Sequence, residues 1–387
     1  MKKNNLLIFK NKKTMKKNNL LIALTLILLV VFSSCKDDDD VTPSEVVRKN
    51  DVPEFYLEAN EGDWGINQPN ILEISSSASR ILKPTDLDFN PTRNGELWIT
   101  NEGTDNTGGT TVRIPNIAAE NYEYDYRKDG NSWHFMAFPT SLAFSNNGDW
   151  ATSTGILDAN RQGGSFTGPA LWSGDLDIYA KPSGGNGSHL DMLHGSPYSM
   201  GIASENDNAY WVFDGYNKHI CRYDFGGDHG PGNADHDDGV IQRFTNISVK
   251  KNGTVPSHMV MNDDRTILYA IDGGNNRVLE IDVNSANRLR SLGLINEQLA
   301  DHSEWNADFE VLASDENFNY CGMAINGNRL FVGDFDNGNI RCIDLITNEE
   351  LGRIETGIQG MTGLAIYNDQ LYFVSYTTNS LYKIEAK

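Results

Sequence analysis

Apolar and polar residues alternate over short runs along most of this chain, and the runs follow one another in a recurring order. The clearest example is Pro256–Asp282, where two apolar runs are separated by a polar turn and a third run follows a Gly/Asn turn at Gly273–Asn276. Alternation over about four to eight residues is typical of half-buried β-strands. This stretch therefore predicts three consecutive strands.

The same plan recurs along the chain, and its six copies are predicted to be structural repeats. The copies open at Pro84, Pro139, Pro197, Pro256, Tyr320 and Met361, which lie 41 to 64 residues apart. A period of this size is typical of propellers and repeat arrays. Six units of about four strands each would close into a ring around an axial channel. The sequence thus predicts an all-β fold, a six-bladed β-propeller within residues 56–387.

The ring is expected to be closed by a strand that precedes the first repeat. The last repeat ends with its third strand, at Ser380–Glu385, and has no fourth. Residues 70–77 form a short alternating run, and we expect them to supply the missing strand, because an unpaired edge would invite aggregation. One segment departs from the strand pattern, since Asn296–Trp305 is predicted to form a short helix.

The first 34 residues have the pattern of a signal peptide. Lys16 and Lys17 precede an apolar run from Leu20 to Phe32, and small residues lead up to Cys35. The apolar run is shorter than the roughly 20 residues of a membrane-spanning helix. We therefore expect residues 1–34 to be a cleaved targeting segment.

Residues 35–55 are predicted to be an acidic tether, because the adjacent carboxylates of Asp37–Asp40 cannot pack into a core. The small residues before Cys35 resemble the bacterial lipobox, and Lys36 with its acidic followers resembles the surface-export signal of Bacteroidetes lipoproteins. The resemblance implies that Cys35 is lipidated and anchors the chain in the outer membrane, facing the cell exterior. The alternatives are a periplasmic orientation and a soluble secreted protein whose tether is only a linker.

The chain is strongly acidic, with a formal net charge of −21. Residues 1–34 contain seven lysines and no acidic residue, so their removal brings the charge to −28. Such a surface repels nucleic acid and favours solubility and cation binding, so we expect no nucleic-acid partner and a monomer. Apart from Cys35, the cysteines are Cys221, Cys321 and Cys342. Their odd number and scatter predict buried apolar fillers rather than disulfides.

The repeats resemble the NHL family of propellers. Each opens with a Pro-x-x-Leu/Met-like pattern, and Gly274–Val278 is the best example of the Gly/Asn turn and Arg-Val that begin the third strand. The resemblance covers residues 84–387 and implies a propeller, a fold that hosts enzymes and binding modules alike. It extends distantly to the propeller of peptidyl-amidoglycolate lyase, which binds zinc through histidines at its channel. The matching positions here are Thr85, Thr140, Tyr198, Ser257, Cys321 and Thr362, and His258 follows one place later.

Histidines and carboxylates gather in one part of the sequence, and they predict a metal site. Six of the eight histidines lie between residues 189 and 258, and several flank the loop Asp228–Gly239. Loops that lead into innermost strands meet at a propeller's channel mouth. Imidazole with carboxylate suits zinc, whereas carboxylates with backbone carbonyls suit calcium. The predicted ligands are His194, His229, His236, His258, Asp228 and Asp235. The alternative is an acidic solvated turn capped by its histidines.

The repeat alignment also predicts which residues line the channel. The candidates are Asp86, Ser141, Ser199 and His258, with glycines in the last two repeats. Asp86 and His258 are the only ionisable members, and they can bind a small ligand, carry out acid/base chemistry or hold water. We expect a surface-anchored binding module for a glycan, peptide or partner protein. The alternatives are a metal-dependent lyase or hydrolase acting at the channel mouth and a scaffold without a ligand.

Overall fold

The computed structural model describes residues 69–159, 167–181, 185–233, 236–293, 295 and 297–385. The predicted signal peptide, the tether and Cys35 lie outside these residues. The described chain is almost entirely β-structure, with one short α-helix, α1 (Ser132–Phe135), and one 3-10 turn, η1 (Gly273–Asn275). Within the part of the chain that is described, no helix is long and apolar enough to span a membrane.

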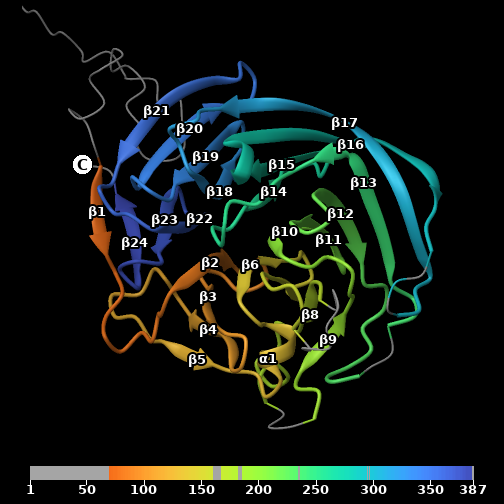
Figure 1. Cartoon of the computed structure of the whole chain (residues 1–387). Helices are drawn as coiled ribbons and strands as arrows, with labels where there is room; N and C mark the ends of the chain where they lie inside the picture. Colours follow the sequence, from red (N-terminus) through yellow and green to blue (C-terminus); the bar gives the residue numbers. More distant parts are fainter. Residues whose placement is uncertain are drawn as a thin grey trace, which may run out of the picture. The chain divides into compact units, whose positions relative to one another are not determined.

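The strands form five sheets that are arranged around a central axis, with the first strand of each repeat nearest that axis (Figure 1). One sheet comprises β2 (Pro84–Phe89), β3 (Leu97–Thr104), β4 (Gly108–Ile114) and β5 (Asp125–Arg127). The next comprises β6 (Pro139–Phe144), β7 (Trp150–Thr154), β8 (Ala170–Trp172) and β9 (His189–Met192). A third comprises β18 (Tyr320–Asn326), β19 (Arg329–Asp334), β20 (Asn339–Asp344) and β21 (Glu349–Glu355). The predicted all-β propeller arrangement is confirmed.

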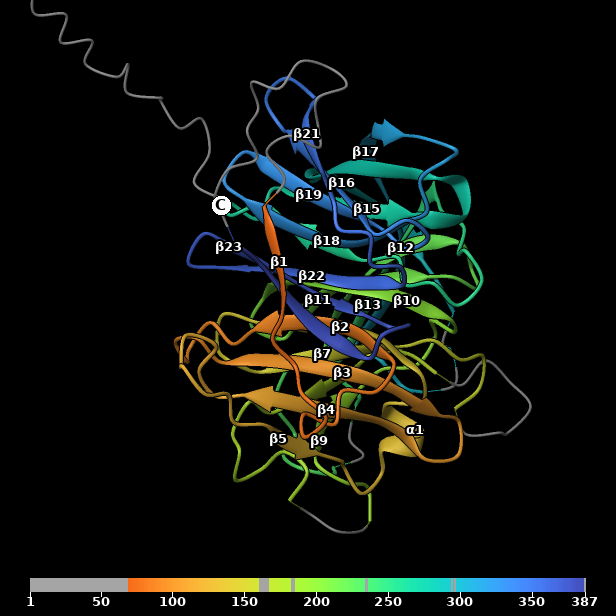
Figure 2. The ribbon, with the colours of Figure 1, turned by 90° about the vertical axis from the view of Figure 1, so that its left-hand side faces the viewer.

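The two ends of the described chain share a sheet. β1 (Asn70–Glu73) pairs antiparallel with β24 (Ser380–Glu385), which follows β22 (Met361–Tyr367) and β23 (Gln370–Ser375). Figure 2 shows β1 running beside the last strands. The pairing expected between residues 70–77 and the last strand is therefore present over four residues.

The remaining strands form a single eight-stranded sheet. Its first half contains β10 (Ser199–Asn206), β11 (Ala209–Asp214), β12 (His219–Asp224) and β13 (Val240–Ser248). Its second half contains β14 (Met259–Met261), β15 (Ile267–Asp272), β16 (Arg277–Ser291) and β17 (Asp301–Ser314). The halves are joined because β17 pairs in parallel with β13, from Val240 opposite Asp301 to Phe244 opposite Trp305.

This junction corrects the prediction of a helix at Asn296–Trp305. Residues from Asp301 onward belong to β17 instead. The open edge of β13 offers unpaired backbone groups, and a strand satisfies them where a helix would not. Tertiary pairing has thus overridden the local pattern.

Buried apolar clusters fill the spaces between neighbouring sheets, so each sheet packs through both faces. The cluster between the first two sheets contains Trp98, Trp150 and Trp172, each 0% exposed. The ring centroids of Trp98 and Trp150 lie 5.3 Å apart. Such dense aromatic packing holds the innermost strands rigidly around the axis.

The innermost strands carry recurrent bulges near their beginnings. The register shifts of β2, β6 and β22 fall at Thr85, Thr140 and Thr362. The Thr140 hydroxyl donates to the Ser199 carbonyl at 2.7 Å, and the Thr362 hydroxyl donates to the Pro84 carbonyl at 2.8 Å. Each hydroxyl therefore ties its strand to the first strand of the next sheet. A bulge also re-aims the residue that follows it.

Candidate functional site

Three of the predicted channel residues meet at the axis. The Ser141 hydroxyl donates to Asp86 Oδ2 at 2.6 Å, and the Leu142 amide donates to the same oxygen at 2.9 Å. His258 Nδ1 lies 3.4 Å from Asp86 Oδ1. His258 Nε2 lies 3.2 Å from the Thr140 carbonyl, which can only accept, so this nitrogen carries a hydrogen. Residues from three different sheets thus form one polar cluster.

Burial shapes the charge of this cluster. Desolvation raises the pKa of Asp86, and the nearby His258 and the Ser141 hydrogen bond act in the opposite direction. Desolvation also raises the pKa of Asp88, two residues along β2, to about 7. The Phe144 amide, which donates to Asp88 Oδ2 at 2.8 Å, opposes this shift. At neutral pH the carboxyl of Asp88 is therefore a mixture of neutral and ionised forms.

A polar cavity of about 350 Å³ lies on one side of the cluster. Its charged and titratable lining residues are Asp86, Asp88, His258, Asp263 and Arg265. Carboxyl groups, an imidazole and a guanidinium here surround a space large enough for several water molecules or a small polar ligand. The carboxyl and imidazole groups are of the kinds that carry out acid/base chemistry, whereas the guanidinium supplies a fixed positive charge.

An apolar cavity of about 270 Å³ opens near the beginnings of the innermost strands, and we call it the channel mouth. Its lining includes the aromatic side chains Phe138, Tyr198, Phe335 and Tyr376, together with Ile156, Val255, Pro256 and the three bulge threonines. The residues come from the first and second strands of the repeats and from the loops beside them. The lining residues of the channel mouth thus belong to or adjoin nearly every sheet, although they are far apart in the sequence.

The channel mouth contains one acidic side chain, Glu102, which is held in place. Its Oε2 accepts a hydrogen bond from the Tyr376 hydroxyl at 2.9 Å and one from Lys83 Nζ at 3.3 Å. The hydrogen bonds that Lys83 makes with Tyr376 and Glu102 raise the pKa of Lys83, so the ammonium group stays charged. This network fixes one wall of the cavity and neutralises its carboxylate.

Two aromatic residues of the channel mouth adopt unusual backbone conformations. Phe138 and Tyr198 have φ angles of 49° and 51°, in the left-handed region that bulky residues rarely enter. Each stands immediately before an innermost strand, β6 or β10. Backbone strain of this kind is concentrated at ligand sites, where the surrounding structure holds it in place.

Ser199 lies elsewhere than the predicted channel position. It opens β10 and pairs with Asp214, as Pro139 opens β6 and pairs with Thr154. Its hydroxyl donates to the Ser196 carbonyl at 2.6 Å. The predicted register of this repeat was therefore wrong by two residues.

The predicted metal ligands are divided among separate places. His194 contacts Glu297, with Nδ1 2.6 Å from a carboxylate oxygen, and His258 belongs to the channel cluster. Asp228 accepts a hydrogen bond from the Gly230 amide at 2.6 Å and so closes a turn. Asp235 lies outside the described residues. His229 and His236 are the two that share a partner.

That partner is Asp191 on β9, which the sequence analysis did not single out. Its side chain is 0% exposed. Its Oδ1 contacts His236 Nδ1, and its Oδ2 lies 3.9 Å from His229 Nε2. Desolvation raises the pKa of Asp191, whereas His236 acts to lower it. The alternation His189-x-Asp191 on a buried strand was the one signal that could have revealed it.

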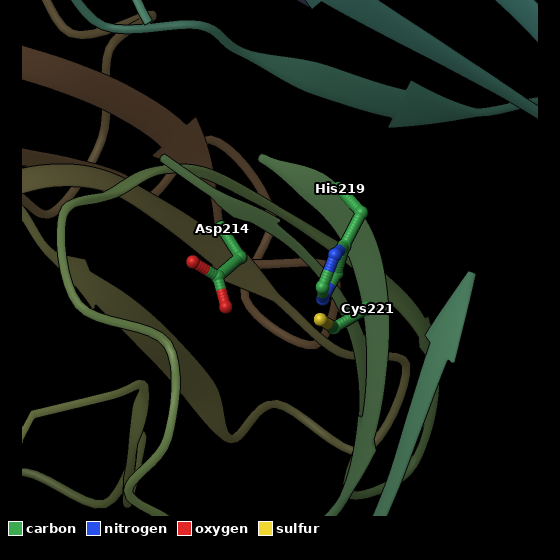
Figure 3. Close-up of side chains that lie close together, drawn as sticks. All are labelled: Asp214, His219 and Cys221. Carbon is green, nitrogen blue, oxygen red and sulfur yellow. The ribbon is translucent and has the colours of Figure 1, made fainter. Parts of the chain in front are cut away.

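Two groups of described side chains have the geometry to hold a metal ion: Asp191, His229 and Asp238, and Asp214, His219 and Cys221. Figure 3 shows the second group converging. The guanidinium of Arg243 already reaches this group, since its Nη1 lies 3.0 Å from Asp214 Oδ2 and 3.5 Å from Cys221 Sγ. Burial raises the pKa of Cys221 to about 12, so its sulfur keeps its proton and is a poor metal ligand.

No protein-family model and no curated protein matches this chain. Solved structures do match it. An auxiliary nutrient binding protein from Bacteroides thetaiotaomicron is 10% identical, with a TM-score of 0.52 over 78% of this chain and 68% of that one. An auxiliary nutrient binding protein from Bacteroides ovatus is 11% identical, with a TM-score of 0.51 over 80% and 70%. Luciferin-regenerating enzyme is 12% identical, with a TM-score of 0.51 over 82% and 95%. At these identities the likeness shows the fold alone.

Proposed function

We propose that this chain is a binding module that takes a small neutral ligand with an apolar face at the channel mouth. The observation that carries the proposal is the cavity of about 270 Å³ walled by Phe138, Tyr198, Phe335 and Tyr376. Ligand pockets are predominantly apolar and aromatic, and they start at roughly 300 Å³. The cavity suits a sugar ring or one apolar peptide side chain.

The polar groups of the channel mouth support a neutral ligand. Glu102 is already paired with Lys83, and the hydroxyls of Thr140 and Thr362 are engaged with neighbouring strands. Few charged groups are left for a charged ligand, and the net charge of −21 repels anions. Rigid aromatic faces lose little conformational entropy on binding, which favours a flat apolar partner.

The fold neighbours agree with this proposal, because two of them are described as auxiliary nutrient binding proteins.

We also propose that the propeller has six blades. The eight-stranded sheet consists of two runs of four consecutive strands, and a buried cluster that includes Phe213 and Leu279 lies between its halves. The parallel pairing of β13 with β17 then joins two blades.

The proposed location is the outer membrane, with the module anchored through a lipid on Cys35 and facing outward. The support is the apolar run, the small residues before Cys35 and the acidic residues after it. The alternative function, a metal-dependent lyase or hydrolase, stays a prediction. In the channel, Asp86, Asp88 and His258 are the groups able to move protons for it.

The proposal is tested by screening neutral mono- and oligosaccharides and short apolar peptides for binding, by calorimetry, to the wild type and to Tyr198→Ala. A ligand of the channel mouth should bind the variant at least about tenfold more weakly, since a buried aromatic anchor is worth about 2 kcal/mol or more. Tyr216→Ala is the control, because Tyr216 is 52% exposed and is not among the lining residues. Equal binding by wild type and Tyr198→Ala would contradict the assignment, as would a screen without binders.

A further inference from the structure

We propose that Asp191, His229 and Asp238 form a binding site for a divalent first-row metal ion, with zinc as the best fit. The site is separate from the channel. Asp191 lies on β9, in one sheet, whereas His229 and Asp238 lie in the segment between β12 and β13 of another. The ion would therefore clamp this segment onto the preceding sheet.

The three ligand atoms already converge. Asp191 offers a carboxylate oxygen, His229 offers Nε2 and Asp238 offers Oδ1, and all lie within 4.8 Å of one another. His229 Nε2 is 2.9 Å from Asp238 Oδ1 and 3.9 Å from Asp191 Oδ2. Zinc binds nitrogen and oxygen at about 2.0–2.2 Å, which places its ligands roughly 3.3 Å apart. Both distances from His229 Nε2 lie within about 0.6 Å of that spacing, and the two carboxylate oxygens are at most 4.8 Å apart.

Each carboxylate is oriented by its other oxygen. The Met192 amide donates to Asp191 Oδ1 at 2.6 Å, and His236 Nδ1 contacts the same oxygen, so Oδ2 is directed toward His229. The Gly227 amide donates to Asp238 Oδ2 at 2.8 Å and leaves Oδ1 facing the imidazole. Metal sites are commonly built this way, with supporting hydrogen bonds that fix the ligating atoms.

The burial of Asp191 is a second observation that supports a cation site. The Asp191 side chain is 0% exposed, and among the described residues its Oδ2 has no hydrogen-bond partner. Leaving a buried carboxylate oxygen without a donor is costly, and native structures rarely do so. A divalent ion at the midpoint of the three ligand atoms would satisfy this oxygen and balance the two carboxylates.

The ligand set and its exposure suggest which ion binds and how. One imidazole favours zinc and its neighbours over magnesium or calcium, which take oxygen ligands. Asp238 is 41% exposed and His229 is 19% exposed, so solvent can reach the fourth coordination position. The exposed partners can adjust around the fixed Asp191. This is a three-ligand site completed by water rather than a closed four-ligand site.

The proposal is tested with purified full-length chain that carries no histidine tag and has been treated with a chelator. Zinc chloride is titrated by calorimetry, and thermal unfolding is followed with and without zinc. We expect one tight site per chain and a rise in Tm, since an ion that binds only the folded state stabilises it. Asp191→Asn and His229→Gln should each weaken binding by about tenfold or more and remove most of the Tm rise.

His219→Gln is the matched control, because it removes an imidazole from the group that Arg243 already occupies. It should bind zinc as the wild type does. Circular dichroism confirms folding of each variant, and if Asp191→Asn fails to fold, His229→Gln carries the test because His229 is partly exposed. Absence of zinc binding by the wild type, or unchanged binding by His229→Gln, overturns the proposal. Neither result bears on ligand binding at the channel mouth.

Discussion

Asp214 and Asp191 are both completely buried carboxylates, and they differ in the cation that faces them. Asp214, at the end of β11, accepts a hydrogen bond from Arg243, which is itself only 8% exposed. Asp191, on β9, faces the imidazoles of His229 and His236. Both stand among side chains that can bind metals. In the first group the chain supplies a guanidinium, which carries a permanent positive charge, whereas in the second the partners of the carboxylate are two imidazoles.

The comparison shows that close ligand atoms do not by themselves make a metal site. A guanidinium stays protonated under all ordinary conditions. Arg243 therefore always supplies a positive charge to the group of Asp214, His219 and Cys221, and a metal ion would have to displace it. Arg243 also donates to the Gly195 carbonyl at 2.6 Å and to His302 Nε2 at 2.8 Å, which links several elements. We therefore interpret this group as a structural ion pair and the Asp191 group as a binding site.

The largest expected loss of free energy of unfolding comes from removing Arg243, the cation that pairs with Asp214. Arg243→Leu would leave Asp214 buried and unpaired, and breaking a buried ion pair in this way costs about 3–5 kcal/mol. Denaturant unfolding of the metal-free protein measures the loss of free energy of unfolding. Arg290→Leu is the control, because Arg290 pairs with Glu304 while 70% exposed, and such surface pairs contribute at most about 1 kcal/mol. Equal losses of free energy of unfolding in the two variants would contradict the interpretation of Arg243 and Asp214 as a buried structural ion pair.

A smaller effect concerns Asp88, a third carboxyl group, whose pKa burial raises more than the nearby Arg265 lowers it. Its pKa is raised to about 7 in the folded chain, against about 3.9 for an unfolded aspartate. The folded state therefore holds the proton more tightly, and the stability that this proton provides is lost as the pH rises from about 4 through 7. Asp88→Asn removes the titration, so its stability should fall less than that of the wild type between about pH 5 and pH 8. Parallel stability curves for the two proteins would show that Asp88 titrates normally.

Much of the fold could be predicted from the sequence because strand alternation and repeat spacing are local patterns. The propeller arrangement and the pairing of β1 with β24 followed from them. The parallel pairing of β13 with β17 could not be foreseen, since it depends on which edges come together in the ring. The start of one innermost strand was also misplaced: Pro139 begins β6, but Pro197 lies two residues before β10, so Ser199 was placed two residues from its true column.

The sites were harder to predict, because a metal site is defined by contacts between sheets. The cluster of histidines in the sequence includes His229 of the proposed metal site, but it grouped His194 and His258 with His229 and His236, and the structure places these two elsewhere. Asp191 was overlooked because its one local signal, the alternation His189-x-Asp191, lies on a strand of only four residues. The channel mouth could not be predicted either, because its aromatic residues come from loops of different repeats that are far apart in the sequence.

The most direct test of the comparison is anomalous diffraction at the zinc absorption edge, from crystals grown with about one equivalent of zinc per chain. We expect one strong anomalous peak between Asp191 Oδ2, His229 Nε2 and Asp238 Oδ1. No peak is expected among Asp214, His219 and Cys221, because Arg243 remains in place there. A peak at the Asp214 group, or no peak beside Asp191 in zinc-bearing crystals, would contradict this expectation.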